Sequence, residues 1–338
     1  YNFLKLNFKN ADMETEKKPF SSDILRLDNI ESVCNNLVLQ LKENVLLQLN
    51  RRGGVVGISG GIDSSVTFAL SVIAFGAENV LGIMMPEADS NPQSEDLARK
   101  LAEKLGVKTI TENITPVLEK LECYKRRDEA ISNVLPEFNP LTDKAKIVLK
   151  QKINNNIPPA FSVTIIKPDG TEISKLLPVK DYLQIVAASN FKQRCRMSML
   201  YYHAERLHYA VIGTPNKHET EQGFFVKYGD GGADVMPIGG LYKTQVYQLA
   251  EYLDIPQEII DRVPTTDTYS AEQTQEEFFY QLPFKTMDLI WYGWENKYTP
   301  AEVAKELGKT EDDIENIYKN FERKRKTADY QRRPPIFF

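Results

Sequence analysis

The chain has 338 residues, with 42 lysines and arginines against 47 aspartates and glutamates, and a formal net charge of −5. Its 42% hydrophobic and 26% charged residues exclude a fibre and a wholly disordered chain, and the length suits one large α/β domain or two smaller ones. We expect no nucleic-acid partner, because a mildly acidic chain lacks a global positive field, and no membrane segment, because its apolar runs fall short of the ~18 residues needed.

The first half of the chain alternates between strand and helix patterns. Residues 1–27 are polar and mixed and are predicted to form an N-terminal arm, and residues 28–50 carry apolar side chains at helical spacing. Three apolar strands follow, each with a predicted helix after it: strands at 55–59, 80–85 and 107–111, and helices at about 63–75, 94–105 and from about 116. Such alternation predicts an α/β fold with a doubly wound parallel sheet.

Residues 124–180 interrupt this alternation. The stretch is rich in proline and contains an asparagine tract at 154–156. Two apolar runs, 161–166 and 172–177, flank Pro168-Asp169-Gly170-Thr171, which is a strong β-hairpin signal. We therefore predict an insertion at about 124–180 that contains a β-hairpin and lies on the surface of the α/β domain.

The alternating pattern resumes after the insertion. A long helix is predicted at 183–207, a strand at 209–213 and a helix at 241–253. From residue 273 the chain is predominantly helical. The predicted organisation is a single domain at 28–272, carrying the insertion, and a helical C-terminal tail at 273–338.

The turn after the first strand has the residues of an anion-binding site. It reads Gly57-Ile-Ser-Gly-Gly-Ile-Asp-Ser-Ser65 and lies where a doubly wound sheet places its ligands. Glycines allow backbone N–H groups to approach an oxyanion, and the next helix directs its positive N-terminus at the turn. The candidate phosphate-binding residues are Ser59, Gly60, Gly61, Ser64 and Ser65. A carboxylate at Asp63 fits beside phosphates if Mg²⁺ bridges the two.

Other interpretations of this turn compete with phosphate binding. A Walker A loop is excluded, because it requires a lysine that is missing here. The segment also matches the G-x-S-x-G nucleophile elbow, which would make the protein a serine hydrolase with Ser59 as nucleophile and a later histidine as base. A purely structural turn is the third alternative.

The same turn resembles the S-G-G-x-D-S loop of N-type ATP pyrophosphatases, and a second set of motifs is similar to the NAD synthetase family. These motifs are N-x-x-x-R-x-R-M at 190–197, G-T-x-x-x-x-E at 213–219, G-F-F-x-K-Y-G-D-G-x-x-D at 223–234, and a downstream Lys243. The resemblance implies an adenine nucleotide alpha-hydrolase-like fold. It also implies ATP-dependent amidation of deamido-NAD to NAD with ammonia, through an acyl-adenylate, with release of AMP and pyrophosphate.

The resemblance also assigns roles to individual residues. Asp63 and Lys243 would be catalytic, and Asp63 and Glu219 would ligate Mg²⁺. ATP would be held by Ser59, Gly60, Gly61, Asp63, Ser64, Ser65, Thr214, Lys243 and Thr265. Deamido-NAD would be contacted by Arg196, Lys227, Asp234 and Lys324.

The family resemblance further implies a homodimer, and three widely spaced cysteines predict a reducing cytoplasm. The roughly 27 residues before the first predicted helix are too few for the glutaminase domain of fused members. We therefore expect free ammonia, or ammonia from a separate glutaminase. Pro215 and Gln222 depart from the usual residues. A paralogue that amidates another carboxylate, for example an acid sugar, remains an alternative.

Overall fold

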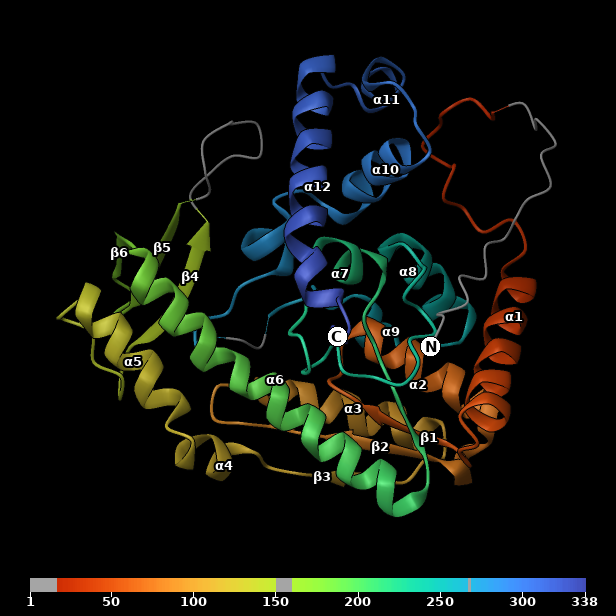
Figure 1. Cartoon of the computed structure of the whole chain (residues 1–338), viewed down its shortest axis with the longest axis horizontal. Helices are drawn as coiled ribbons and strands as arrows, with labels where there is room; N and C mark the ends of the chain where they lie inside the picture. Colours follow the sequence, from red (N-terminus) through yellow and green to blue (C-terminus); the bar gives the residue numbers. More distant parts are fainter. Residues whose placement is uncertain (1–16, 150–159, 267–268) are drawn as a thin grey trace.

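The computed structural model describes residues 17–149, 160–266 and 269–338. Its centre is a parallel sheet of four strands in the order β3-β2-β1-β7 (Figure 1). The strands are β1 (Gly54–Gly57), β2 (Val80–Met84), β3 (Thr109–Thr111) and β7 (Ala210–Ile212). The predicted doubly wound α/β fold is confirmed, although each strand is one or two residues shorter than its apolar pattern.

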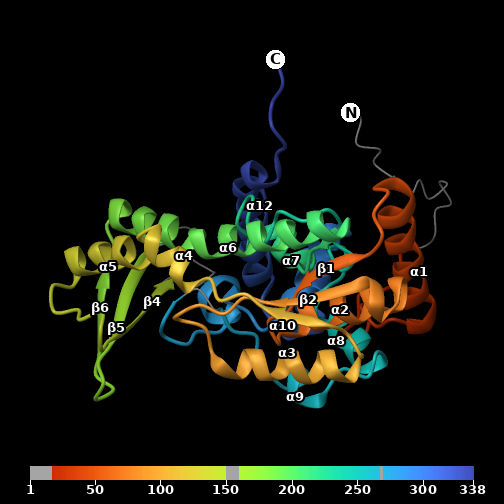
Figure 2. The same ribbon diagram turned by 90° about the horizontal axis from the view of Figure 1, so that it is seen from below.

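Helices cover both faces of this sheet (Figure 2). Alternate strand residues face opposite sides, so Val56 joins a core with one set of helices while Val55 packs toward Leu200 and Ala204 of a single long helix. That long helix is α6 (Val179–Leu207). The opposite layer consists of α1 (Ile30–Lys42), α2 (Ile62–Phe75), α3 (Pro92–Lys104), α8 (Lys243–Tyr252) and α9 (Gln257–Ile260).

Two predicted helices are divided in the structure. The helix expected at 28–50 is α-helical as α1 and continues as a π-helical segment, η1 (Glu43–Gln48). The helix expected from about 116 is α4 (Thr115–Lys120), and a second helix, α5 (Cys123–Val134), follows it. The break lies at Glu122, whose φ of 53° is left-handed and cannot continue a helix. A short 3₁₀ turn, η2 (Ala77–Asn79), precedes β2.

The insertion forms an antiparallel sheet of three strands in the order β4-β5-β6. The predicted hairpin is confirmed as β5 (Phe161–Ile166) and β6 (Glu172–Leu176). An additional strand, β4 (Lys144–Leu149), pairs with β5. This sheet packs on α5 and the first turns of α6 at one end of the molecule (Figure 1). The asparagine tract lies outside the described residues.

The C-terminal tail is helical, as predicted, and has an aromatic core around Trp291, Tyr280 and Phe321. Its elements are η3 (Glu276–Tyr280), α10 (Phe284–Glu295), α11 (Pro300–Leu307) and α12 (Glu311–Arg332), which packs beside α7 (Lys217–Gln222). Residues 1–16 of the predicted arm lie outside the described residues. Its described part packs on the tail through Leu25, and the Tyr298 hydroxyl donates to the Lys18 carbonyl at 2.7 Å. In the part of the chain described here, no helix combines the length and apolarity needed to cross a membrane.

Candidate active site

The loop between β1 and α2 is shaped by one glycine and fixed by its serines. Gly60 has a φ of +68°, and a Cβ there would lie 2.5 Å from the Ser94 carbonyl oxygen of α3, so no larger residue fits without a backbone shift. The hydroxyls of Ser64 and Ser65 donate to the Gly61 carbonyl at 3.0 and 2.8 Å. The loop thus lies against α3 with the N-terminus of α2 directly behind it.

This loop forms one wall of a small pocket of about 140 Å³. Segments that are far apart in the sequence contribute the other walls: Ser94 of α3, the stretch after β7, α7, α8, residues 262–265 and Gln275. The pocket brings together most of the residues predicted to bind ATP and metal, namely Ser59, Gly61, Asp63, Ser64, Thr214, Glu219, Lys243 and Thr265. Gly60 and Ser65 belong to the same loop but do not line this pocket.

A buried ion pair joins the two predicted catalytic residues. The Lys243 ammonium, whose side chain is fully buried, contacts the Asp63 carboxylate directly. Burial alone would lower the pKa of Lys243, but the carboxylates of Asp63 and Glu219 outweigh burial and raise that pKa above its usual value. Lys243 is therefore a permanently charged group at the base of the pocket.

Glu219 supplies the second carboxylate of the pocket. It lies in the first turn of α7, where its side chain accepts from the Asn216 backbone N–H at 2.8 Å in a capping box. Burial, and then the nearby Asp63 carboxylate, raise the pKa of Glu219 to about 8. Among the described residues, no group of three or more His, Cys, Asp or Glu side chains is placed to hold a metal ion.

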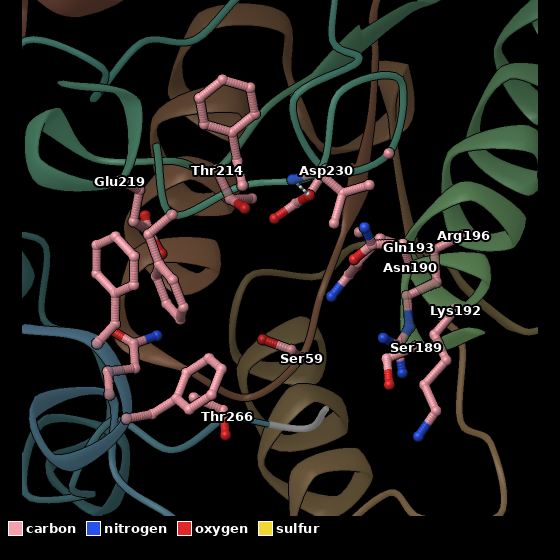
Figure 3. A pocket seen from close by; sticks show the side chains of 18 of the residues that line it. Ser59, Ser189, Asn190, Lys192, Gln193, Arg196, Thr214, Glu219, Asp230 and Thr266 are labelled. Carbon is pink, nitrogen blue, oxygen red and sulfur yellow. Dashed lines mark hydrogen bonds between the residues drawn. The ribbon is translucent and has the colours of Figure 1, made fainter. Parts of the chain in front are cut away.

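A larger cavity of about 1240 Å³ adjoins the small pocket and shares Ser59, Thr214 and Glu219 with it. Figure 3 shows Thr214 and Glu219 on one side of this cavity and Arg196 of α6 on the other. Arg196 Nε donates weakly to the Met85 carbonyl at 3.4 Å. The cavity extends from the parallel sheet to the insertion sheet and α12, so all three parts of the fold form its wall.

Lys324 of α12 also lines this cavity. Its Nζ donates to the Phe279 carbonyl at 2.9 Å and to Gln222 Oε1 at 3.3 Å, and it lies 4.4 Å from the Phe279 ring centre. Burial, and then the charge of Arg323, lower the pKa of Lys324 to about 7. When it is protonated, this ammonium has only neutral hydrogen-bond partners among the described residues, which suits it to an anionic ligand.

Two predicted substrate residues lie elsewhere. Lys227 Nζ donates to the carbonyls of Tyr330 and Arg333, at 3.2 and 2.8 Å, and so holds the end of α12. The Asp234 carboxylate accepts from the Val211 N–H at 2.8 Å and from the Tyr201 hydroxyl at 3.1 Å. Neither side chain lines the large cavity, although residues beside both of them do.

Comparison with known proteins identifies the family. The family model described as NAD synthase matches residues 33–139 and 142–335. The chain belongs to the NAD synthase family. The NH(3)-dependent NAD(+) synthetase of Mesorhizobium japonicum is 48% identical over 302 residues, covering 89% of this chain and 94% of that protein. That of Methanocaldococcus jannaschii is 33% identical, covering 82% and 87%.

Two solved structures have a fold similar to that of this NAD synthase family member. The NMN synthetase from Francisella tularensis has a TM-score of 0.60 at 22% identity, covering 91% of this chain and 98% of that one. The NH3-dependent NAD synthetase from Campylobacter jejuni has a TM-score of 0.59 at 20% identity, with the same coverage. At these identities the similarity concerns the fold alone.

The geometry argues against the serine hydrolase alternative and agrees with membership of the NAD synthase family. All three histidines are among the described residues, and each ring has other partners. His218 is paired with Asp288 at 2.6 Å, His203 with Glu112 at 2.8 Å, and His208 with Arg51 at 2.8 Å. The Ser59 hydroxyl instead contacts the Ser64 hydroxyl at 3.2 Å. An elbow serine needs a base within hydrogen-bond reach, and no histidine provides one here.

Sequence reasoning assigned no role to several polar residues that line these cavities in this member of the NAD synthase family. Asn190 and Gln193 of α6 point into the large cavity beside Arg196 (Figure 3). The signal was available, because residues three and four apart share a helix face. Arg262 was also missed. It lines the small pocket and lies three residues before Thr265, so its place depends on how the chain leaves α9 rather than on a local motif.

Proposed function

We propose that this chain catalyses the ATP-dependent amidation of deamido-NAD to NAD with ammonia, releasing AMP and pyrophosphate. The observation that carries this proposal is the junction of the two cavities at Ser59, Thr214 and Glu219. A small polar pocket suited to phosphates opens there into a cavity large enough for a dinucleotide. Relatives covered over most of their length are named NH(3)-dependent NAD(+) synthetases, which supports the same activity.

The proposed reaction has two steps. A carboxylate oxygen of deamido-NAD attacks the α-phosphorus of ATP, a new P–O bond forms, and the bond to the bridging oxygen breaks so that pyrophosphate leaves with its electron pair. Ammonia then attacks the acyl carbon of the adenylate, loses a proton, and AMP leaves with the C–O bonding pair. Both steps place negative charge on phosphate oxygens, so positioning and electrostatic stabilisation suffice without a protein nucleophile.

Several groups of this chain are placed to stabilise the negative charge on the phosphate oxygens. The backbone of the 59–65 loop and the N-terminus of α2 bind phosphate oxygens by N–H donation. Lys243 lies at the base of the same pocket as a permanent cation, and Asp63 holds its ammonium in place. Thr214 and Thr265 add hydroxyl donors at the rim. We assign these residues to ATP.

Mg²⁺ fits this pocket through Asp63 and Glu219. The two carboxylates lie close enough for Asp63 to raise the pKa of Glu219. The single charge of the Lys243 ammonium, which interacts with both, does not balance two ionised carboxylates, so a further positive charge would be stabilised there. Hard oxygen ligands from only two side chains suit Mg²⁺, which keeps several waters and is completed by substrate phosphates. When bound, Mg²⁺ would supply neutralisation of the charge on those phosphates.

We assign the larger cavity to deamido-NAD, with Arg196 of α6 and Lys324 of α12 as anion-binding residues in its lining. The side chains of Lys227 and Asp234 instead hold the walls of that cavity in place, because each binds a backbone group of a neighbouring segment.

We further propose a cytoplasmic homodimer supplied with free ammonia or by a separate glutaminase. Leu183 and Tyr202 on α6 are candidate dimer contacts, because they are 57% and 58% exposed. Analytical ultracentrifugation measures the mass of the protein in solution and so tests for the dimer.

The proposed function is tested with purified protein, ATP, Mg²⁺, ammonium chloride and deamido-NAD. We expect NAD, AMP and pyrophosphate in equal amounts, no NAD without ammonia, and no NAD from Asp63→Asn. Other carboxylates, including acid sugars, are supplied in parallel. Rapid AMP release with one of these acids, and none with deamido-NAD, would overturn the assignment of the acceptor.

A further inference from the structure

Arg262 brings a second positive charge to the small pocket. Of the residues that the structure describes, only Lys243 and Arg262 contribute cationic side chains to its wall. The charge of Lys243 is already matched by Asp63 in the buried ion pair. No described acidic side chain forms an ion pair with Arg262, so its charge is available to a ligand.

Neutral groups hold the Arg262 guanidinium at the rim of the pocket. Nη2 donates to the Ser94 hydroxyl at 2.8 Å, and Nη1 donates weakly to the Gly60 carbonyl at 3.5 Å. A guanidinium carries five N–H donors in a planar fork, so donors remain after these two contacts. Ser94 belongs to the first turn of α3, and Gly60 to the phosphate-binding loop. The side chain therefore lies across the gap between these two elements.

We propose that Arg262 binds the pyrophosphate part of ATP and stabilises it as it leaves. The inference rests on the proposed function, because it places the β- and γ-phosphates in the small pocket. When the bond between the α-phosphorus and the bridging oxygen breaks, the electron pair moves onto pyrophosphate and its charge grows. A guanidinium with free donors at that position makes charge-assisted hydrogen bonds that strengthen during this step.

Arg262 complements Lys243 and does not duplicate it. Lys243 is fully buried and its ammonium is held by a carboxylate, so it provides a fixed positive charge at the base of the pocket. Arg262 is half-buried at the rim and can donate two parallel hydrogen bonds to one phosphate group. Lysine at position 262 would keep the charge but lose this paired geometry.

The test is pyrophosphate binding by titration calorimetry in Mg²⁺ buffer, with the kcat of NAD formation measured beside it. A hydrogen bond to a charged group contributes about 1.5–3 kcal/mol, so we expect Arg262→Gln to weaken pyrophosphate binding between about tenfold and about a hundredfold. Arg262→Lys should lose less pyrophosphate affinity than Arg262→Gln. In Arg262→Gln, the kcat of NAD formation should fall by a larger factor than the KM for ATP rises.

Lys100→Gln is the matched control. Lys100 lies on α3 and forms an exposed ion pair of 2.6 Å with Glu258 of α9, so the variant removes one positive charge without changing the lining of the pocket. Ser94→Ala removes the hydrogen bond that holds Arg262 and keeps the guanidinium, and it should lose less pyrophosphate affinity than Arg262→Gln. Thermal melts confirm that each variant is folded.

Three results would overturn the proposal: equal pyrophosphate affinity in Arg262→Gln and the unsubstituted protein, an equal loss in Lys100→Gln, or an equal loss in Ser94→Ala. The binding measurement needs no carboxylate substrate. It therefore separates the role of Arg262 from the choice of acceptor. If NAD formation failed but the affinity changes followed the expected order, only the acceptor assignment would fall.

Discussion

Replacing Lys243 by methionine separates the structural role of the buried ion pair from its chemical role. Methionine is unbranched and of similar size, and the Lys243 ammonium already lies 5.2 Å from the Phe284 ring centre, so the new side chain has an apolar neighbour. The Asp63 carboxylate would lose its cation while remaining beside Glu219. Removing one partner of a buried pair costs about 3–5 kcal/mol.

The expected loss lies at the lower end of that range. The Asp63 side chain is 15% exposed, so water partly compensates the uncovered charge, and we expect about 3 kcal/mol. For a large domain this corresponds to a fall of about 6 °C in Tm. Turnover should fall at least about a hundredfold, because the pocket loses its fixed positive charge.

The double variant Asp63→Asn with Lys243→Met supplies the contrast. It removes both charges, and replacing a whole buried pair by neutral groups is often nearly neutral for stability. We therefore expect most of the lost Tm to return while turnover remains absent. Differential scanning calorimetry and the NAD assay measure the two effects. Unchanged stability in Lys243→Met, or restored turnover in the double variant, would refute this reasoning.

Two further predictions concern Glu219 and Lys227. Because burial and Asp63 raise the pKa of Glu219 to about 8, the folded chain binds a proton there that the unfolded chain releases from about pH 4.5 upward. The Tm of the unsubstituted protein and of Glu219→Gln is measured in EDTA between pH 5.5 and pH 8.5. The difference between the two Tm values should decrease as the pH rises, because the unsubstituted protein loses the stabilising proton. A difference that stays constant would contradict this pKa. Lys227→Ala should change the KM for deamido-NAD by less than about threefold, since its ammonium binds backbone carbonyls, but should speed proteolysis of the C-terminal segment. A tenfold rise in KM would place Lys227 at the substrate instead.

Local patterns were sufficient to predict the turn at 57–65 and the sheet around it. A short apolar strand, two glycines and a helix start lie within a dozen residues, so the loop's shape depends on its own sequence. The positive φ of Gly60 and its close approach to Ser94 agree with the glycine expected there. The β5–β6 hairpin was likewise predictable, because its turn residues determine the register.

Features that depend on tertiary contacts could not be predicted in this way. The strand β4 was missed because its partner β5 begins only at Phe161, so the pairing of Lys144–Leu149 leaves no local turn signal beside it. The contacts of Lys227 could not be predicted either, because its ammonium donates to the carbonyls of Tyr330 and Arg333, about a hundred residues later in the chain. Arg262 lies just after α9, which packs against α2, and lines the small pocket together with residues from distant parts of the chain.

The most direct test of the central claim follows one oxygen atom. Deamido-NAD labelled with ¹⁸O in its carboxylate is incubated with the protein, ATP, Mg²⁺ and ammonia. The mass of the AMP product is then measured by mass spectrometry. Attack of the carboxylate on the α-phosphorus leaves one labelled oxygen on AMP when ammonia displaces it, so we predict AMP heavier by one ¹⁸O substitution. Unlabelled AMP formed together with NAD would contradict the acyl-adenylate and with it the roles assigned to this site.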